Sequence, residues 1–414
     1  MNAVHKLAEA LARRSAIPVG VWALGFVSLL MDVSSEMIHA LLPIYLVTIM
    51  GASMEAVGMI EGIAEATASI VKVFSGALSD WLGRRKLLAA LGYGLSALSK
   101  PIFPLAGSLG WVAGARFLDR VGKGVRGAPR DALIADIAPP EARGAAFGLR
   151  QALDTVGAFV GPLIAVALMA ATAGAFRVVF WAAVVPAVLA VALLVAVVRE
   201  PRASRAPDRA RLPFSGEAMR RLGPAYWLVV AIAALFTLAR FSEAFLVLRA
   251  QGLGLPVALA PLTFVAMNLV YALAAYPAGI LSDRFDRLTI ATIGFVALIA
   301  AELALALAGG LAGAALGVAL WGLHLGLTQG ILSALVADAA PADQRGAAFG
   351  VFNLVSGVAL LAASLAAGAL WDAYGPRAPF FAGAAVALAA LAALAVVARA
   401  APTLWARLGG AGRV

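Results

Sequence analysis

The stretch ALIADIAPPEARGAAFG at residues 132–148 returns as ALVADAAPADQRGAAFG at residues 334–350. Twelve of the seventeen positions are identical, and the second copy begins 202 residues after the first, which is close to half of the 414-residue chain. A shorter pair, GALSD at 76–80 and GILSD at 279–283, keeps the same order. A chain that repeats once, half-way along, indicates two bundles of one design, and substrate-carrying membrane proteins are commonly built in this way.

The overall composition is that of a membrane protein. Hydrophobic residues make up 63% of the chain, charged residues 13%, and the mean hydropathy is +0.95. An ordinary soluble domain is roughly 45–50% apolar and about 25% charged, so a soluble fold is excluded. A spanning helix needs roughly 20 apolar residues. We therefore predict an all-α membrane protein with twelve transmembrane helices, at 18–49, 54–78, 85–107, 110–137, 143–172, 176–198, 223–249, 255–281, 288–309, 311–337, 346–371 and 377–398.

Charged residues lie unevenly between these spans. The net charge is +10, and the basic residues cluster in alternate connections, whereas the loops 107–110 and 309–313 carry no charge. Basic loops remain in the cytoplasm, so we expect cytoplasmic termini and a basic surface that faces the lipid bilayer and binds no nucleic acid. The polar break at 199–222 is interpreted as a cytoplasmic linker between two six-helix bundles, 1–198 and 223–414.

No metal, cofactor or nucleotide site is expected. The chain has no cysteine, and its three histidines lack the spacing of metal ligands. The run GKGVRG at 122–127 matches a dinucleotide fingerprint, but no βαβ unit surrounds it, and Phe117 and Gly124 break the phosphate-loop pattern. We therefore expect no enzyme, and transport would be driven by an ion gradient or by the gradient of the substrate itself.

The loop GALSDWLGRRKLL at 76–88 resembles the cytoplasmic loop signature of the major facilitator superfamily, a glycine and an aspartate followed by Gly-Arg-Arg. The chain departs from that pattern at Trp81 and, in the weaker second copy, at Asp286. The resemblance implies two pseudo-symmetric six-helix bundles. It also implies a cytoplasmic latch between them, formed by Asp80, Arg84 and Asp283.

The predicted fifth span carries closely spaced glycines. Their pattern resembles the glycine and Gly-Pro signature of the drug/proton antiporter branch, and is formed by Gly148, Gly157, Gly161 and Pro162. The glycine pair that ends the signature is missing here. We expect Gly157, Gly161 and Pro162 to form a hinge in a helix that bends or slides against the other half. The resemblance favours export over uptake.

The predicted fourth span is the most charged. Arg116, Arg120 and Lys123 share one helical face, and charges at bilayer depth cost about 2.5–3.5 kcal/mol each on insertion scales, so they face a cavity or a partner. The segment 120–128 resembles the superfamily's span-4 signature, with Lys123 in place of a glutamine and Arg126 in place of a glycine. That resemblance implies a role of Arg120 in proton coupling. The alternative is a static ion-pair network.

Carboxylates accompany these cations. A carboxyl group binds a proton more readily in a low-dielectric site, and an adjacent arginine opposes this, so a carboxyl group whose surroundings change can load and release a proton. By the resemblance, spans 1, 4, 7 and 10 line the central cavity, and we expect Glu36 to pair with Arg120. The residues expected in coupling or in the cavity are Asp32, Glu36, Arg116, Arg120, Lys123, Arg240 and Glu243, with Glu61, Glu65 and Asp154 as secondary acids.

Aromatic, amide and imidazole side chains of the spans are candidates for the substrate cavity, although each of these residue types also serves in packing. They are His39, Asn268, Tyr271, Trp321, His324, Gln329 and Asn353. Glu302, in the predicted ninth span, has no assigned role.

The combined interpretation is a monomeric secondary active transporter of the bacterial inner membrane that works by alternating access. Proton-coupled export of a small organic compound is the first hypothesis. Uptake or exchange of an organic anion on the electropositive face of span 4 is the second. A non-transporting receptor on the same fold is a third, of another class, and flux measurements separate it from a transporter.

Overall fold

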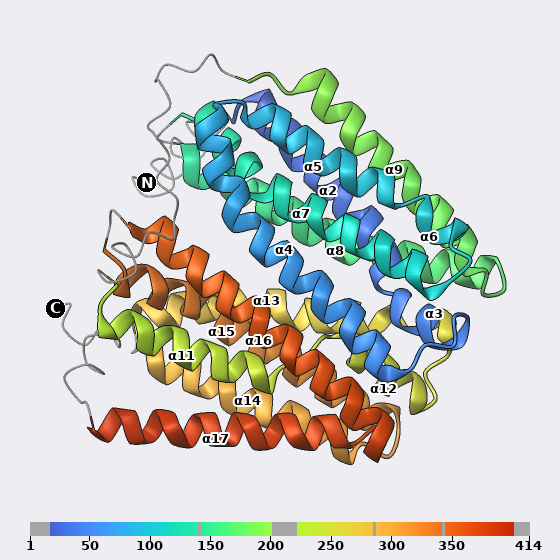
Figure 1. Cartoon of the computed structure of the whole chain (residues 1–414), viewed down its shortest axis with the longest axis vertical. Coiled ribbons are helices and arrows are strands. Elements are labelled where there is room, and N and C mark those ends of the chain that lie inside the picture. The colour runs from blue at the N-terminus through green and yellow to red at the C-terminus, as the bar shows by residue number, and fades with distance from the viewer. Residues whose placement is uncertain (1–16, 140–141, 201–221, 285–286, 342–343, 401–414) are drawn as a thin grey trace, which may run out of the picture.

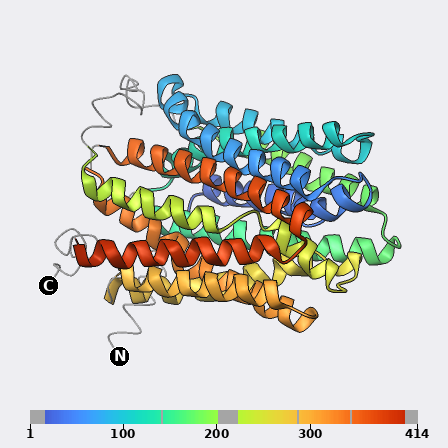
Figure 2. The same cartoon turned by 60° about the horizontal axis from the view of Figure 1, so that its bottom comes forward.

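The computed structural model describes residues 17–139, 142–200, 222–284, 287–341 and 344–400. In these ranges the regular secondary structure consists of helices alone. Figure 1 shows a first set of helices, blue to green, lying above a second set, lime to red. Figure 2 shows that most of them run roughly alongside one another, as in a membrane bundle.

The first set comprises the helices of residues 19–197. They are α2 (Val19–His39), α3 (Leu42–Thr48), α4 (Met54–Leu82), α5 (Arg85–Ser99), α6 (Ile102–Leu105), α7 (Leu109–Ile137), α8 (Arg143–Ala171) and α9 (Phe176–Val197).

The second set comprises the helices of residues 224–400. They are α11 (Pro224–Ala239), α12 (Ala244–Gly252), the 3₁₀ helix η2 (Val257–Leu259), α13 (Leu262–Arg284), α14 (Arg287–Leu307), α15 (Leu311–Ala339), α16 (Arg345–Tyr374) and α17 (Ala378–Ala400). Each of the twelve predicted spans coincides with one of these helices or with a consecutive pair. Within the described ranges, nine helical segments are long and apolar enough to cross a membrane. The remaining three spans, α4, α5 and α7, fall outside these nine because α4 and α7 carry mid-helix charges and α5 has 15 residues.

The internal repeat is also a structural repeat. The helices α7 and α8 begin at residues 109 and 143, and α15 and α16 begin at 311 and 345, again 202 residues later. Arg143 Nε donates to the carbonyl of Ala135 at 3.2 Å, and Arg345 Nε donates to the carbonyl of Ala337, also at 3.2 Å. The two copies of the sequence therefore close the same turn with the same hydrogen bond, which confirms the predicted pseudo-symmetry.

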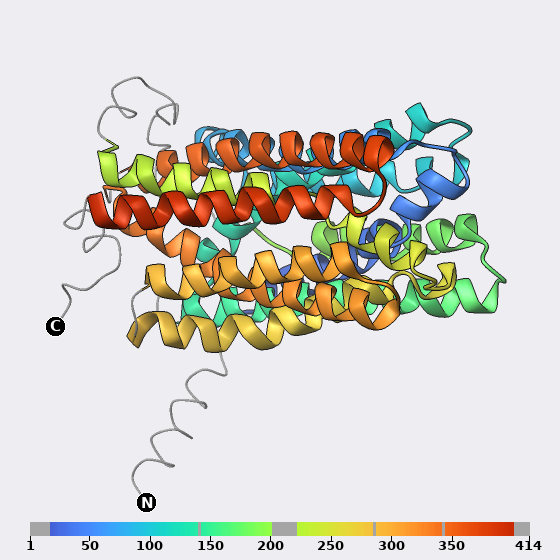
Figure 3. The same ribbon diagram turned by 90° about the horizontal axis from the view of Figure 1, so that it is seen from below.

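Each set packs mainly within itself. In the first set α2 lies against α8 and α9, and α7 against α4 and α5. In the second set α15 lies against α13 and α14, and α11 against α16 and α17, which is visible from below in Figure 3. The sets meet where α4 packs on α16 and α8 on α13. The linker predicted at 199–222 falls almost entirely outside the described residues, and the boundaries of the two bundles stay a prediction.

Small residues bring α4 and α16 into backbone contact. A Cβ atom on Gly62 would lie 3.1 Å from the Cα of Leu361, and one on Gly368 would lie 2.6 Å from the Cα of Glu55. Such close approach is typical of small residues at membrane helix interfaces. The close contact between α4 and α16 therefore depends on glycines, which have no side chain to hold the two backbones apart.

The buried apolar residues of the described ranges form three separate cores, which show where the two sets are packed together. One core draws on both sets, from Met37 and Ile44 on one side and Phe245 and Trp321 on the other, at the end that contains α3 and α12. The other two cores, at the opposite end, belong to one set each. The two sets are therefore packed together at the α3/α12 end, and their cores are separate at the end where α2 begins and α17 finishes.

Candidate functional site

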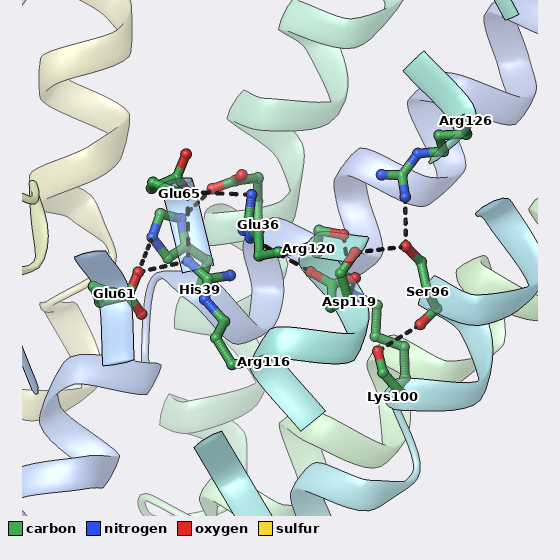
Figure 4. Close-up of polar contacts among 12 residues, drawn as sticks. Glu36, His39, Glu61, Glu65, Ser96, Lys100, Arg116, Asp119, Arg120 and Arg126 are labelled. Carbon is green, nitrogen blue, oxygen red and sulfur yellow. Dashed lines mark hydrogen bonds and ion pairs between the residues drawn. The ribbon is translucent and has the colours of Figure 1, made fainter. Parts of the chain in front are cut away.

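A chain of buried polar groups connects α7, α4 and α2. Arg116 Nη2 donates to Glu61 Oε2 at 2.6 Å, and both side chains are at most 2% exposed. The same Glu61 oxygen lies 3.5 Å from His39 Nε2, and His39 Nδ1 lies 3.4 Å from Glu36 Oε2. The imidazole therefore lies between two carboxylates (Figure 4).

The helices α4 and α7 form a second ion pair, one helical turn further along. Arg120 Nη1 lies 3.3 Å from Glu65 Oε1, as Arg116 faces Glu61. Both pairs join residues four apart on each helix, and such residues share one helical face. This explains why two acids and two arginines at equal spacing meet in register.

A third group of contacts ties α5 to α7 and α2. Lys100 Nζ donates to Asp119 Oδ1 at 2.9 Å and to Ser35 Oγ at 3.0 Å, and the lysine is 1% exposed. Arg126 donates to the hydroxyl of Ser96 and lies over the ring of Tyr93, 4.9 Å from its centre. Figure 4 shows Lys100, Ser96 and Arg126 on the side of Arg120 that is away from Glu61. A buried lysine needs such partners, because an unpaired charge in an apolar interior is costly.

The same chain of contacts continues toward the end where α2 begins. Arg150 Nη1 lies 2.8 Å from Asp154 Oδ2, and Arg130 Nη2 lies 3.0 Å from Asp131 Oδ1. Arg130 also donates to Ser28 Oγ at 3.1 Å. The strongly basic face predicted for span 4 is therefore largely neutralised by carboxylates.

The expected ion pair between Glu36 and Arg120 is not formed. Glu36 contacts His39, and Arg120 lies nearest to Glu65 and Asp119. The pairing differs because α7 packs extensively against α4 and only slightly against α2. In the part of the chain that the structure describes, Asp32 has no hydrogen bond or ion pair.

The glycines of the fifth span press on the acid-bearing face of α2. A Cβ on Gly157 would lie 3.0 Å from the Cβ of Asp32, and one on Gly161 would lie 3.0 Å from the Cβ of Glu36. They therefore contact α2 of the same half, and α8 is one continuous helix through Pro162. The hinge role of these residues stays a prediction.

The predicted cytoplasmic latch lies partly outside the described side chains. Those of Asp80 and Asp283 are not described, and Arg84 is exposed where α5 begins. Arg85 makes the contacts there, 2.9 Å from Asp136 Oδ2 and 2.9 Å from the carbonyl of Ala132, both in the first set. The latch stays a prediction.

The second set contains a partly open pocket of about 250 Å³, lined by residues of α11, α14, α15 and α16. Among the predicted cavity residues, Arg240, His324 and Gln329 line it. The ring of His324 is fixed by a hydrogen bond of 2.8 Å from Nδ1 to the carbonyl of Gly294, since a carbonyl can only accept.

The other predicted cavity residues lie elsewhere. Trp321 is fully buried in the shared core, where its ring faces Phe241 at 5.7 Å. Tyr271 packs against that core. His39 belongs to the polar chain. Asn268 and Asn353 are half-buried and do not line the pocket.

Several residues of the polar network were not predicted as site residues, Lys100, Ser96 and Arg150 among them. One signal was available for Lys100, because it stands within the predicted third span, next to Pro101. A lysine inside an apolar span needs a buried partner. In the described part of the structure, no group of three or more His, Cys, Asp or Glu residues could hold a metal ion.

Comparison with known proteins agrees with this architecture. The sequence matches the Major Facilitator Superfamily over residues 24–363, with a second match over 242–411. It is 33% identical over 380 residues to an uncharacterized MFS-type transporter of Methanocaldococcus jannaschii, covering 89% of this chain and 92% of that protein. It is 30% identical over 357 residues to an uncharacterized protein of Mycobacterium tuberculosis, covering 85% and 86%.

Solved structures share the fold. A bacterial homolog of the human lysosomal transporter Spinster, in an inward-facing conformation, superimposes with a TM-score of 0.68 at 18% identity, covering 94% of this chain and 96% of that one. A POT family transporter in complex with a thioalcohol-conjugated peptide gives a TM-score of 0.78 at 14% identity, covering 94% and 97%. At these identities the likeness concerns the fold alone.

Proposed function

The chain belongs to the Major Facilitator Superfamily and is a multi-pass membrane transporter of the secondary type, and on this basis we propose that it exports a small organic compound in exchange for protons. We place it in the bacterial inner membrane, as a monomer with cytoplasmic termini, working by alternating access. The basic connections described above support that orientation.

The position of His39 carries the proposal of proton coupling. Glu36, Glu61 and Arg116 together have one negative charge in excess, and a proton on His39 between the two carboxylates makes the cluster neutral. Buried charge is tolerated when it is balanced and hydrogen-bonded. The cluster is therefore suited to hold one proton.

The same histidine lies at the junction of the two sets. Its ring packs against Phe264 of α13, with the ring centres 5.0 Å apart. A movement of the second set against the first would remove Phe264 and open His39 to water. Proton release would then depend on the conformational change, as coupling requires.

The sealed and unsealed ends fit the inward-open step of an export cycle. With cytoplasmic termini, the end where the two cores are separate faces the cytoplasm, and the shared core closes the opposite end. In this arrangement an exporter takes up its substrate, and an importer would release it. The glycines of α8 that touch Asp32 and Glu36 would transmit movement of α8 to the acid-bearing helix.

The proposal is tested in proteoliposomes that contain a pH-sensitive dye. Drugs, metal chelates, siderophores and organic acids are first screened by thermal shift, and a stabilising compound is then followed as it crosses the membrane. Antiport predicts proton movement opposite to the compound and accumulation that follows the pH gradient. His39→Gln should retain compound binding and lose the proton movement. Flux that ignores the pH gradient, or protons that travel with the compound, would contradict proton-coupled export.

A second candidate is uptake or exchange of an organic anion. It is favoured by Arg240, a cation that lines the pocket of the second set. The sign of the gradient that drives accumulation separates uptake from export. A receptor without transport would show binding in the thermal shift screen and no flux.

A further inference from the structure

Four cations of the polar network are paired with carboxylates. Arg116 and Arg120 face glutamates, Lys100 faces Asp119, and Arg150 faces Asp154. A guanidinium that already holds a carboxylate in a bidentate or close contact has few donors left for a ligand. Arg116 and Arg120 are therefore poorly available to an anion, contrary to the expectation from the sequence. Lys123, on the same helix, is exposed and is the competing cation.

Arg240 is different. It stands where α11 ends, in the extended break between α11 and α12, with φ −111° and ψ 118°. Within the described ranges no carboxylate lies within ion-pair distance of it, and its side chain is only half-buried. Glu243, three residues on, influences it electrostatically but makes no ion pair with it. Discontinuous helices are where transporters of several folds place their substrate groups.

The pocket around Arg240 has two kinds of lining. Phe236, Phe295 and Phe352 provide aromatic surface, and Phe236 stacks on Phe295. Thr328 and Gln329 are polar residues that also line the pocket. A mostly apolar pocket with a few convergent polar groups is the usual form of a small-molecule site.

We propose that this pocket binds a small organic anion with a planar apolar body, such as an aromatic carboxylate, and that Arg240 holds its anionic group. The planar guanidinium matches a carboxylate with two parallel hydrogen bonds. The volume of about 250 Å³ suits a compound of one or two rings. This inference rests on the proposed transport function and names the class of its substrate.

The test is equilibrium binding of three probes of one shape to the purified full-length protein in detergent, without any pH gradient. Naphthoate, naphthamide and naphthylmethylamine are anionic, neutral and cationic. We expect naphthoate to bind at least about tenfold more tightly than naphthamide, as a charge-assisted hydrogen bond allows. Arg240→Gln should abolish this difference while it leaves naphthamide binding unchanged, and Arg240→Lys should retain part of it.

Two further variants sharpen the result. Arg177→Gln removes an exposed arginine at the start of α9, away from the pocket, and should change nothing. Glu243→Gln removes the nearby negative charge and should tighten naphthoate binding. Size-exclusion profiles and melting temperatures establish that each variant is folded.

No preference for naphthoate in the wild type would overturn the proposal, as would a preference that survives Arg240→Gln or disappears in Lys123→Gln instead. Such a failure leaves proton-coupled export intact, because the binding assay contains no gradient. Conversely, loss of proton coupling in the vesicle experiment leaves the anion site intact.

Discussion

Asp372, near the end of α16, accepts a hydrogen bond of 2.8 Å from the backbone N–H of Glu55 in the first turn of α4. Its other carboxylate oxygen accepts from the N–H of Met54 at 3.1 Å. The first N–H groups of a helix have no partner in the helix itself, and an anion there is favoured by the helix dipole. The contact joins the first set to the second at the sealed end.

We predict that Asp372→Asn weakens the closure of that end. The loss of the negative charge at the helix N-terminus should cost about 1 kcal/mol, roughly a fivefold change in the population of the sealed state. The chain has no cysteine, so cysteines introduced at the exposed residues Ile49 and Leu259 would be the only sites that a spin label modifies. The distance between the two labels can then be measured. The distribution should extend to longer distances in the variant.

Glu55→Gln is the matched control, since it removes an exposed charge in the same turn but keeps both hydrogen bonds from the backbone to Asp372. An equal broadening of the distance distribution in both variants would show that the negative charge of this region, and not the hydrogen bonding of Asp372 to the start of α4, keeps the two sets together at this end.

A second prediction concerns the Arg116–Glu61 pair. Arg116→Met leaves the fully buried Glu61 with only His39, which it shares with Glu36, and this should cost about 3–5 kcal/mol of stability. Adding Glu61→Gln removes that charge, so the double variant should recover most of the loss. Thermal unfolding of the two single variants and the double variant in one detergent measures the coupling. A double variant no more stable than Arg116→Met would mean that the pair contributes packing and not charge balance.

The helices were predictable from the sequence because apolar length and repeated motifs are local properties, and every predicted span corresponds to helix. The break at residues 240–243 was not predicted, since ARFSEA contains neither proline nor glycine. The sequence also identified Glu36 and Arg120 as charged residues of the spans. Their partners, His39 and Glu65, depend on how each helix is rotated against its neighbours. Rotation is decided by close packing, such as that of Gly157 on α2, which one sequence does not reveal.

A third prediction tests that packing. A methyl group on Gly157 would lie 2.7 Å from the carbonyl oxygen of Leu29, so Gly157→Ala must push α8 away from α2. We expect a loss of about 1–3 kcal/mol, typical of overpacking, together with reduced transport. Gly148→Ala, on the same helix, has no neighbour within 4 Å of the new methyl group and should behave as wild type. Equal melting temperatures and equal flux for both variants would show that α8 and α2 separate freely.

The last prediction concerns Glu302, the acid of α14 that the proposed mechanism does not use. It is fully buried, and neither carboxylate oxygen has a hydrogen-bond partner among the described residues. Its Oε1 faces Gly383 of α17, where an added Cβ would lie only 2.6 Å away, and the carbonyl oxygen of Ala239 lies 2.9 Å from the same point. An isolated carboxylate in such a place is far more costly than a neutral acid.

We therefore expect Glu302 to carry its proton, which allows it to donate a hydrogen bond toward the carbonyl at the end of α11. Glu302→Gln keeps the shape and a donor, so the melting temperature should be unchanged or higher. Infrared difference spectra of wild type and variant at neutral pH should contain the carbonyl stretch of a protonated carboxylic acid that only the wild type has. A carboxylate band in its place, or a stability loss above about 2 kcal/mol in Glu302→Gln, would show instead that Glu302 is ionised and paired with a cation in the membrane.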